Sequence, residues 1–279
     1  MLKLGGVLKL VRPVNAVIAF LAVMSGAAAV TKTFLNPEVF LGAISASLIL
    51  MSGNAVNDVF DIESDRINRP NRPLPRGDLS AKQAIGISLI LAGLALILAY
   101  SINFRCFLVA SFYAAIFFAY AVWLKPTGLL GNIIVSSGTG MSFIYGSFTV
   151  DWLRPLIVIF AICAFILNLG REIVKGVEDL EGDRARKCRT IAISQGPRIA
   201  GLIVVVLYAA ALPLSVAPFL LGYTGLYYLF SILVADLVVV AVIRESFGLQ
   251  MENAARASRL IKISMTVGIV AFFVGAISQ

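Results

Sequence analysis

Long runs without a charged residue divide this chain of 279 residues. A helix needs about 20 mostly apolar residues to cross the hydrocarbon core of a bilayer, and most of these runs reach that length. The uncharged runs are 13–31, 39–57, 83–104, 106–124, 126–150, 156–170, 199–235 and 263–279. The run 199–235 is long enough for two crossings, with a turn at 222–225. We therefore predict an all-α, polytopic membrane protein that forms one integral-membrane domain over residues 1–279. Its nine transmembrane helices are expected at about 13–31, 38–56, 82–102, 104–123, 129–149, 153–170, 197–220, 224–243 and 258–278.

Composition excludes several classes of protein. Only 14% of the residues are charged and 59% are hydrophobic, whereas soluble domains are about a quarter charged and disordered segments are poor in apolar residues. The chain has no histidine, which excludes His-ligated metals and His-based catalytic triads. Its three cysteines show no CxxC spacing, so we expect them to be small buried hydrophobic residues.

The basic residues predict an orientation. With nine spans and a cytoplasmic N-terminus, 20 of the 23 lysines and arginines fall in the N-terminal segment or in segments between spans on the cytoplasmic side. Cytoplasmic loops of membrane proteins carry such an excess of Lys and Arg. We expect a multi-pass protein of the cell membrane whose N-terminus and acidic segments face the cytoplasm.

Ten of the fifteen acidic residues fall in two short windows. One window follows the second expected span and the other follows the sixth. Four crossings separate the two windows, so both lie on the same face of the membrane. The acids are Asp58, Asp61, Glu63, Asp65 and Asp78 in the first window, and Glu172, Glu178, Asp179, Glu181 and Asp183 in the second.

The spacing within each window places oxygen ligands in a row. Residues four apart share a helix face, and this spacing joins Asn57, Asp61 and Asp65 in one window and Lys175, Asp179 and Asp183 in the other. Like charges at this spacing repel unless a cation lies between them. Hard oxygen ligands suit Mg²⁺, which typically bridges carboxylates and substrate phosphates. The alternative is that each row is only a solvated helix face. The candidate metal ligands are Asn57, Asp58, Asp61, Asp65, Glu172, Asp179 and Asp183.

Basic residues follow both acidic rows. They are Arg66, Arg69, Arg72 and Arg76 after the first, and Arg184, Arg186, Lys187 and Arg189 after the second. Because guanidinium groups bind phosphate oxygens well, an acidic row with a basic loop indicates a clamp for a metal and a diphosphate. The alternative is that many of these residues only set the topology. Lys125 is the only charge in its loop and lies beside Pro126, from where we expect it to reach the same site.

Two motifs carry a resemblance to a known family. The stretch from Asn57 to Asp65, followed by the segment 71–77 (NRPLPRG), resembles the first signature of the UbiA-type intramembrane prenyltransferases. The stretch Lys175–Asp183 (KGVEDLEGD) resembles their second signature. The likeness covers essentially the whole chain, and two long motifs at the expected places are more specific than one short motif. One departure is Gly176, where many relatives carry another acid.

The resemblance implies a nine-helix bundle with a cytoplasm-facing active site, built around the motif segments of about 57–80 and 171–196. Family members bind an isoprenyl diphosphate through Mg²⁺, ionise its allylic C–O bond and transfer the prenyl group to a lipophilic acceptor. The expected catalytic residues are Asp61, Asp65, Asp179 and Asp183. The expected ligands of the diphosphate or of an acceptor phosphate are Asn57, Arg66, Arg72, Lys125, Lys175, Arg189 and Arg12. The carbocation requires a dry, aromatic wall, for which the sequence singles out no particular residue.

The segment 171–184 is most similar to the branch of this family that transfers a geranylgeranyl group from geranylgeranyl diphosphate to geranylgeranylglyceryl phosphate, forming an ether of archaeal membrane lipids. The alternative within the family is an aromatic acceptor of the 4-hydroxybenzoate, homogentisate or chlorophyllide type. A divalent-cation transporter would place ionisable ligands near the middle of the bilayer, yet only Asp236 falls inside an expected span. We expect the lipid bilayer as the surroundings of the chain, and neither a nucleic acid nor an obligate protein partner.

Overall fold

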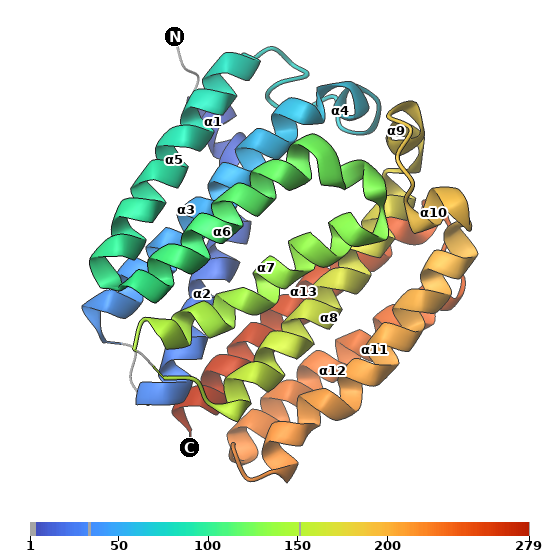
Figure 1. Cartoon of the computed structure of the whole chain (residues 1–279). Coiled ribbons are helices and arrows are strands. Elements are labelled where there is room, and N and C mark those ends of the chain that lie inside the picture. Colours follow the sequence, from blue (N-terminus) through green and yellow to red (C-terminus); the bar gives the residue numbers. More distant parts are fainter. Residues whose placement is uncertain (1–3, 33–34, 151, 279) are drawn as a thin grey trace.

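The computed structural model describes residues 4–32, 35–150 and 152–278. Within these residues, nine long helices run side by side (Figure 1). They are α2 (Pro13–Thr31), α3 (Pro37–Phe60), α5 (Ala81–Ile102), α6 (Phe104–Ala119), α7 (Leu129–Phe148), α8 (Pro155–Glu178), α11 (Pro197–Leu220), α12 (Leu226–Phe247) and α13 (Met251–Ile277). Four short helices accompany them: α1 (Leu4–Val11), α4 (Ile62–Asn68), α9 (Leu180–Ala185) and α10 (Ile191–Ser194). A π-helical turn (Tyr120–Leu124) and a 3₁₀ turn (Lys125–Thr127) join α6 to α7.

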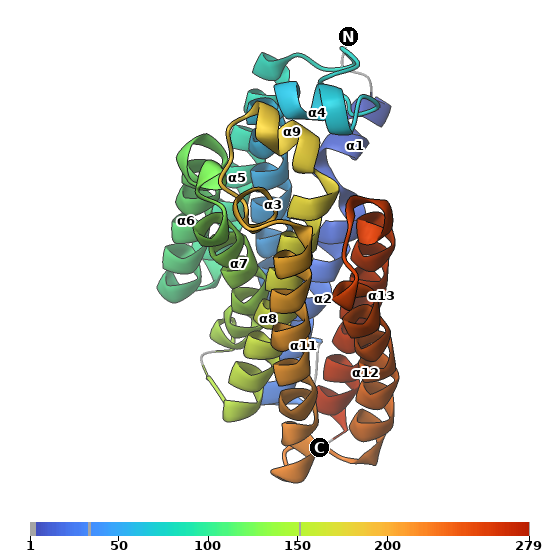
Figure 2. The same cartoon turned by 90° about the vertical axis from the view of Figure 1, so that its right-hand side faces the viewer.

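The long helices alternate in direction around a central space. Helix α2 packs against α3, α7 and α13, and α8 packs against α7, α11 and α13. Helices α5 and α6 lie outside α3. The short helices α1, α4, α9 and α10 all lie at one end of the bundle, and the C-terminus lies at the other (Figures 1 and 2). We call the first of these the motif end.

Local sequence sets most helix starts. Proline occupies the first turn of α2, α3, α8 and α11, where its missing N–H group costs no hydrogen bond. Ser80 caps α5 in a capping box with Gln83, and the side chain of Asn103 caps α6. Such caps satisfy amide groups that the helix itself leaves without a partner.

Eight helices of the described part of the chain are long and apolar enough to cross a membrane. They correspond to eight of the nine expected spans. The ninth expected span, 129–149, is α7, which has 20 residues but is rich in Gly, Ser and Thr. The expected all-α membrane bundle is confirmed, whereas the count of nine crossings stays a prediction.

Three helices are clearly longer than the sequence predicts, one of them α13, which begins at Met251 instead of near 258. Helix α3 continues to Phe60 instead of ending near 56, and α8 continues to Glu178 instead of ending near 170. The hydropathy signal weakens where polar residues begin, but the backbone stays helical because those side chains do not interrupt its hydrogen bonds. The first residues of both acidic rows therefore lie on the long helices themselves.

Glycines allow α2 and α7 to pack closely. A Cβ atom on Gly26 would lie 1.9 Å from the carbonyl oxygen of Phe143, and one on Gly146 would lie 2.0 Å from that of Val23. Helices that pack in membranes use small residues in this way, because lipid provides no hydrophobic driving force between them. This pair of contacts fixes α2 against α7 next to the central space.

Gly146→Ala is expected to destabilise the protein by about 1–3 kcal/mol, because the added methyl group meets backbone atoms that cannot move independently. The measurement is thermal unfolding of the purified protein in detergent. Gly93→Ala on α5 is the matched control, since a Cβ atom there meets nothing within 4 Å. Equal unfolding temperatures for the two variants would contradict the close packing of α2 and α7.

Candidate active site

Both acidic rows have the same backbone form. Helix α3 is followed by Asp61 (φ −94°, ψ 0°) and α8 by Asp179 (φ −96°, ψ 14°), and a short helix begins directly after each of these residues. The i to i−4 hydrogen bonds continue through both junctions, from Asp65 N–H to Asp61 C=O (2.8 Å) and from Asp183 N–H to Asp179 C=O (3.0 Å). Each row therefore keeps its four-residue spacing across a bend in the backbone. The spacing could be predicted from the sequence, but the bend could not.

The two rows meet through contacts between α4 and α9, which lie together at the motif end (Figure 2). The Asn68 side chain donates to the carbonyl oxygen of Asp179 (3.0 Å) and accepts from the amide of Gly182 (3.2 Å). A Cβ atom on Gly182 would lie 2.3 Å from Asn68 Nδ2. Arg69 donates to both carboxylate oxygens of Asp179 (2.9 and 3.0 Å).

Asn68→Ala is expected to lower turnover about 10- to 100-fold, the range seen when groups that orient metal ligands are removed. The substitution removes the side-chain hydrogen bonds of Asn68 to Asp179 and Gly182, so the second row loses its fixed position relative to the first. Steady-state kinetics would measure the loss, and circular dichroism would check the fold. Unchanged kinetics would show that this contact does not position the rows.

The carboxylates of the first row are buried and paired with basic side chains. Asp61 is 2% exposed and forms ion pairs with Lys125 and Arg186. Arg72 donates to Asp65 (2.6 Å) and to Asp58 (3.2 Å). Asp58 also pairs with Arg12. A buried charge is tolerated when it is paired and hydrogen-bonded, so these basic groups allow the acids to be buried together.

Arg12 reaches this row because of its backbone conformation. It lies between α1 and α2 with φ 54°, a left-handed conformation that is strained for a residue with a side chain. From there its guanidinium group contacts Asp58 and also Asn54 (3.3 Å). The strain is offset by these contacts, which place a cation of the N-terminal segment in the site.

These surroundings shift the pKa values in different directions. Burial would raise the pKa of Asp61, but Lys125 and Arg186 outweigh it and lower that pKa below its ordinary value. Burial raises the pKa of Asp65 despite the neighbouring Arg72. Burial also raises the pKa of Asp183 to about 6, against the attraction of Lys125. Asp61 is thus held as an anion, whereas Asp183 takes up a proton more readily.

The second row is less completely neutralised. Glu172 accepts from Lys175 (2.9 Å) and Arg171 (3.1 Å), and Asp179 is paired with Arg69. Asp183 is 8% exposed, and in the structure as described its carboxylate has no ion pair. Across 4–32, 35–150 and 152–278, no three Asp, Glu or Cys side chains lie close enough to hold a metal ion. The basic side chains lie between the acids instead, so the metal-binding role of the rows stays a prediction.

A cavity of about 580 Å³ opens beside the two rows, within the size range of ligand pockets. Its polar end is lined by Asn57, Glu172, Asp179 and Asp183 together with Arg12, Arg69, Arg72, Lys125 and Lys175. Asp58, Asp61 and Asp65 lie behind these basic side chains and outside the lining. The polar end therefore presents both oxygen ligands and cations to a bound molecule.

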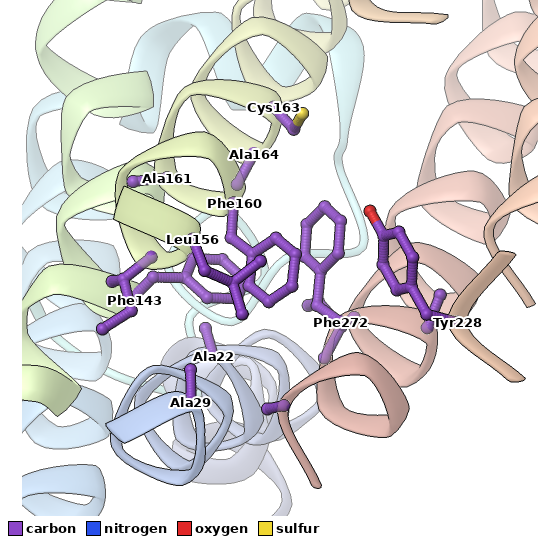
Figure 3. Close-up of a cluster of buried hydrophobic side chains, with 14 of the residues drawn as sticks. Ala22, Ala29, Phe143, Leu156, Phe160, Ala161, Cys163, Ala164, Tyr228 and Phe272 are labelled. Carbon is purple, nitrogen blue, oxygen red and sulfur yellow. The ribbon is translucent and has the colours of Figure 1, made fainter. Parts of the chain in front are cut away.

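The other end of the cavity is apolar and rich in aromatic side chains. Five aromatic residues line it, namely Tyr113, Phe117, Phe143, Tyr145 and Phe272, whereas Tyr120 lines the cavity near the acids of the polar end. Phe272 stacks on Phe160 (centroids 4.2 Å apart) and meets Phe143 edge-on. Figure 3 shows these rings packed with Ala22 in one buried cluster, which closes this end of the cavity. These aromatic residues are the candidates for the aromatic wall that the resemblance implies.

The oxygen donors fit a hard divalent cation. Asn57 donates to Asp61 (2.6 Å) through Nδ2, while its Oδ1 atom is buried without a hydrogen-bond partner. A buried acceptor without a partner is costly, and this one lies on the row that the spacing assigned to a metal. The donor set is made of carboxylate and amide oxygens, which Mg²⁺ prefers.

Most predicted site residues converge, but two do not. The side chains of Arg66 and Arg189 are exposed and lie outside the cavity lining. The sequence did not predict that Arg69 and Arg186 are partners of the acids. The spacing does not indicate which arginine of one motif segment reaches an acid of the other row. Asp236 lies on α12, away from this cavity, and accepts from the hydroxyl of Ser215 (2.8 Å).

Comparison with known proteins decides the family. The model of the UbiA prenyltransferase family matches residues 16–267. The chain belongs to the UbiA prenyltransferase family. The resemblance of the two motifs is therefore confirmed, and with it a multi-pass membrane protein.

Similar UbiA proteins extend over the whole chain. It is 36% identical to digeranylgeranylglyceryl phosphate synthase of Korarchaeum cryptofilum over 270 residues, covering 96% of both chains. It is 35% identical to the protein of the same name from Thermococcus sibiricus, covering 98% of this chain and 97% of that one. A solved structure described as digeranylgeranylglyceryl phosphate synthase superposes with a TM-score of 0.77 at 32% identity and 99% coverage of both chains.

A more distant UbiA structure has the same fold. The UbiA homologue from Archaeoglobus fulgidus bound to DMAPP and Mg²⁺ superposes with a TM-score of 0.70 at 19% identity, covering 95% of this chain and 98% of that one. At this identity the likeness shows the fold alone. The UbiA bundle expected from the sequence is thereby confirmed.

Proposed function

We propose that this chain transfers a geranylgeranyl group from geranylgeranyl diphosphate to the hydroxyl of geranylgeranylglyceryl phosphate, in an Mg²⁺-dependent reaction of archaeal membrane lipid synthesis. The observation that carries the proposal is a cavity whose polar end combines oxygen ligands with cations and whose other end is apolar and aromatic. That division matches a diphosphate attached to a long hydrocarbon. Relatives named for this product align with the full length of the chain.

The acidic rows would hold the metal. The first candidates are Asn57, Asp179 and Asp183, which line the cavity, and Asp61, which lies behind the lining and accepts from Asn57. Together they combine a free amide oxygen with carboxylates from both rows. When bound, Mg²⁺ supplies positive charge that stabilises the leaving diphosphate. The basic residues at the polar end, Arg12, Arg72 and Lys125, would exchange their carboxylate partners for phosphate oxygens. Their present ion pairs keep them in place for that exchange, which is electrostatic preorganisation.

The reaction breaks the bond between the allylic carbon and the diphosphate oxygen, whose electron pair leaves with the diphosphate. The acceptor hydroxyl oxygen then bonds to the allylic carbon and loses its proton to a carboxylate or to the released diphosphate. The aromatic wall excludes water and attracts the carbocation through its π-systems. No histidine is needed, because a neutral hydroxyl captures the cation and the proton leaves afterwards.

The motif end would face the cytoplasm. The basic residues Arg12, Arg69, Arg72, Lys125 and Arg184 of α9 all belong to segments at that end of the bundle. Cytoplasmic segments carry the excess of Lys and Arg. A water-soluble diphosphate leaving group would then be released on the side where the cell uses it. Labelling of single cysteines introduced at Glu63 and Arg154 in intact cells tests this orientation.

A panel of acceptors tests the proposed reaction. Purified protein, Mg²⁺ and geranylgeranyl diphosphate are incubated with geranylgeranylglyceryl phosphate, 4-hydroxybenzoate or homogentisate, and the products are identified by mass spectrometry. We expect the diether from the glyceryl phosphate alone. Product from 4-hydroxybenzoate and none from the glyceryl phosphate would replace the proposal by prenylation of an aromatic acceptor.

A further inference from the structure

A second group of cations lines the cavity on the side formed by α8 and α13. Arg171 lies on α8 and Lys262 on α13, and both line the cavity. Sequence analysis assigned neither residue to the site. Lys262 lies 11 residues after the start of α13, about 16 Å along its axis at 1.5 Å per residue, directly before the uncharged run 263–279 of this candidate membrane span.

The charge of Lys262 is not neutralised by an acid. Within the described ranges its ammonium group makes no hydrogen bond or ion pair, and the charged group that acts on it is Arg171, another cation. Arg171 has one acidic partner, Glu172, at 3.1 Å, which it shares with Lys175. Arg171 and Lys175 thus share one carboxylate, and Lys262 has none in the described structure.

The first acidic row is different in this respect. There Arg12, Arg72 and Lys125 each have a buried carboxylate partner. On this side Arg171 shares the buried Glu172 with Lys175, and Lys262 has no such partner in the described structure, so the neighbouring cations repel each other. An anion bound between Arg171 and Lys262 would offset the electrostatic repulsion between them.

The position of this pair fits the second substrate. Arg171 lies about two helical turns before Asp179 on α8, whereas Met265 and Phe272 continue the α13 wall towards the apolar end. A phosphorylated lipid acceptor must bring its hydroxyl to the diphosphate-bearing carbon. Its own phosphate must stay away from the diphosphate, since two anions in one clamp would repel. A separate pair of cations at the border of the polar and apolar ends meets both requirements.

We propose that Arg171 and Lys262 bind the phosphate monoester of the lipid acceptor, apart from the clamp that binds the prenyl diphosphate. The assignment of this ligand rests on the proposed function. The guanidinium group offers a two-pronged contact to the phosphate and the ammonium group a mobile point charge. These contacts make the enzyme select a phosphorylated acceptor over the same lipid without phosphate.

The test is the preference for the phosphorylated acceptor. Initial rates with geranylgeranylglyceryl phosphate and with geranylgeranylglycerol give kcat/KM for each, in wild type and in Lys262→Met, which keeps the length of the side chain. We expect the ratio of the two values to fall about tenfold or more, the effect of losing one hydrogen bond to a charged group. The KM for geranylgeranyl diphosphate should change much less than that for the acceptor.

Arg259→Gln is the matched control. Arg259 is an exposed cation on the same helix, one turn before Lys262, and does not line the cavity. Its replacement should leave the ratio at the wild-type value in neutral detergent and in vesicles of phosphatidylglycerol. An effect of Lys262→Met that appears only in phosphatidylglycerol vesicles would assign Lys262 to bilayer headgroups and overturn the proposal.

A binding measurement separates this proposal from the proposed function. Titration calorimetry of geranylgeranylglyceryl phosphate into the protein without prenyl diphosphate should show weaker binding to Lys262→Met than to wild type. That result supports the phosphate site even if no acceptor yields product, an outcome that would remove only the proposed function. Equal binding by both proteins, or a larger effect on geranylgeranyl diphosphate than on the acceptor, would overturn the proposal.

Discussion

Asp61→Asn is expected to lower kcat for prenyl transfer by at least about 100-fold, the scale of losing one preorganised charge contact at a reacting group. Asp61 lies at the bend of the first row and is 2% exposed. It pairs with Lys125 and Arg186 and accepts from Asn57. The substitution removes one negative charge from the candidate metal site and leaves two cations without their charged partner. Steady-state kinetics with geranylgeranyl diphosphate would measure the loss.

The loss of activity must be separated from loss of the fold, because breaking a buried ion pair costs about 3–5 kcal/mol. Asp183→Asn provides that separation, since in the described structure Asp183 has no ion pair to lose and its carboxylate lines the cavity. It should lower kcat to a similar extent with an unchanged unfolding temperature. Glu63→Gln is the control, an exposed acid within the same motif. Wild-type turnover in Asp183→Asn would refute its assignment to the metal site.

Removal of divalent metal is expected to abolish turnover, and addition of Mg²⁺ should restore it. In the proposed reaction the diphosphate, which carries several negative charges, would bind beside the acidic rows, so a metal would be needed to offset the repulsion between them. The measurement is the initial rate after EDTA treatment and during titration with Mg²⁺. Full activity in excess EDTA would contradict a metal-dependent reaction.

The fold should survive this treatment. In the described structure, basic side chains already neutralise Asp58, Asp61 and Asp65, so the metal is not required to hold the two rows together. The unfolding temperature in EDTA is expected to equal that of untreated protein. Mg²⁺ together with inorganic diphosphate should raise it, because a ligand that binds only the folded state stabilises that state.

The membrane helices could be predicted from the sequence because each of them leaves a local signal. Proline in the first turn and an uncharged run mark α2 at the residues where the structure begins and ends it, and Pro197 with the turn at 222–225 marks α11. The ends of α3 and α8 were placed too early, since hydropathy falls at Asn57 and Arg171 although the backbone hydrogen bonds continue. The bends at Asp61 and Asp179 leave no local signal, because no proline or glycine occupies either position.

The candidate site was only partly predictable for a similar reason. The four-residue spacing identified both rows, and the even number of crossings placed them at one end of the bundle. The partners of the acids come from elsewhere in the chain: Arg186 follows the second row but binds Asp61 of the first, and Arg69 does the reverse with Asp179. These ion pairs between the two motif segments depend on how α4 packs against α9. The sequence of one segment alone does not determine that packing.

The most direct test of the metal clamp is an experimental structure with Mn²⁺ in place of Mg²⁺ and a non-reacting thio analogue of geranylgeranyl diphosphate. Anomalous scattering at the manganese edge then locates the metal without assumptions about its ligands. We predict a peak coordinated by oxygens of both rows, with Asn57 or Asp61 on one side and Asp179 or Asp183 on the other, and the diphosphate in contact with Arg72 and Lys125. A metal bound elsewhere, or by one row with the other still paired to its basic partners, would contradict the account.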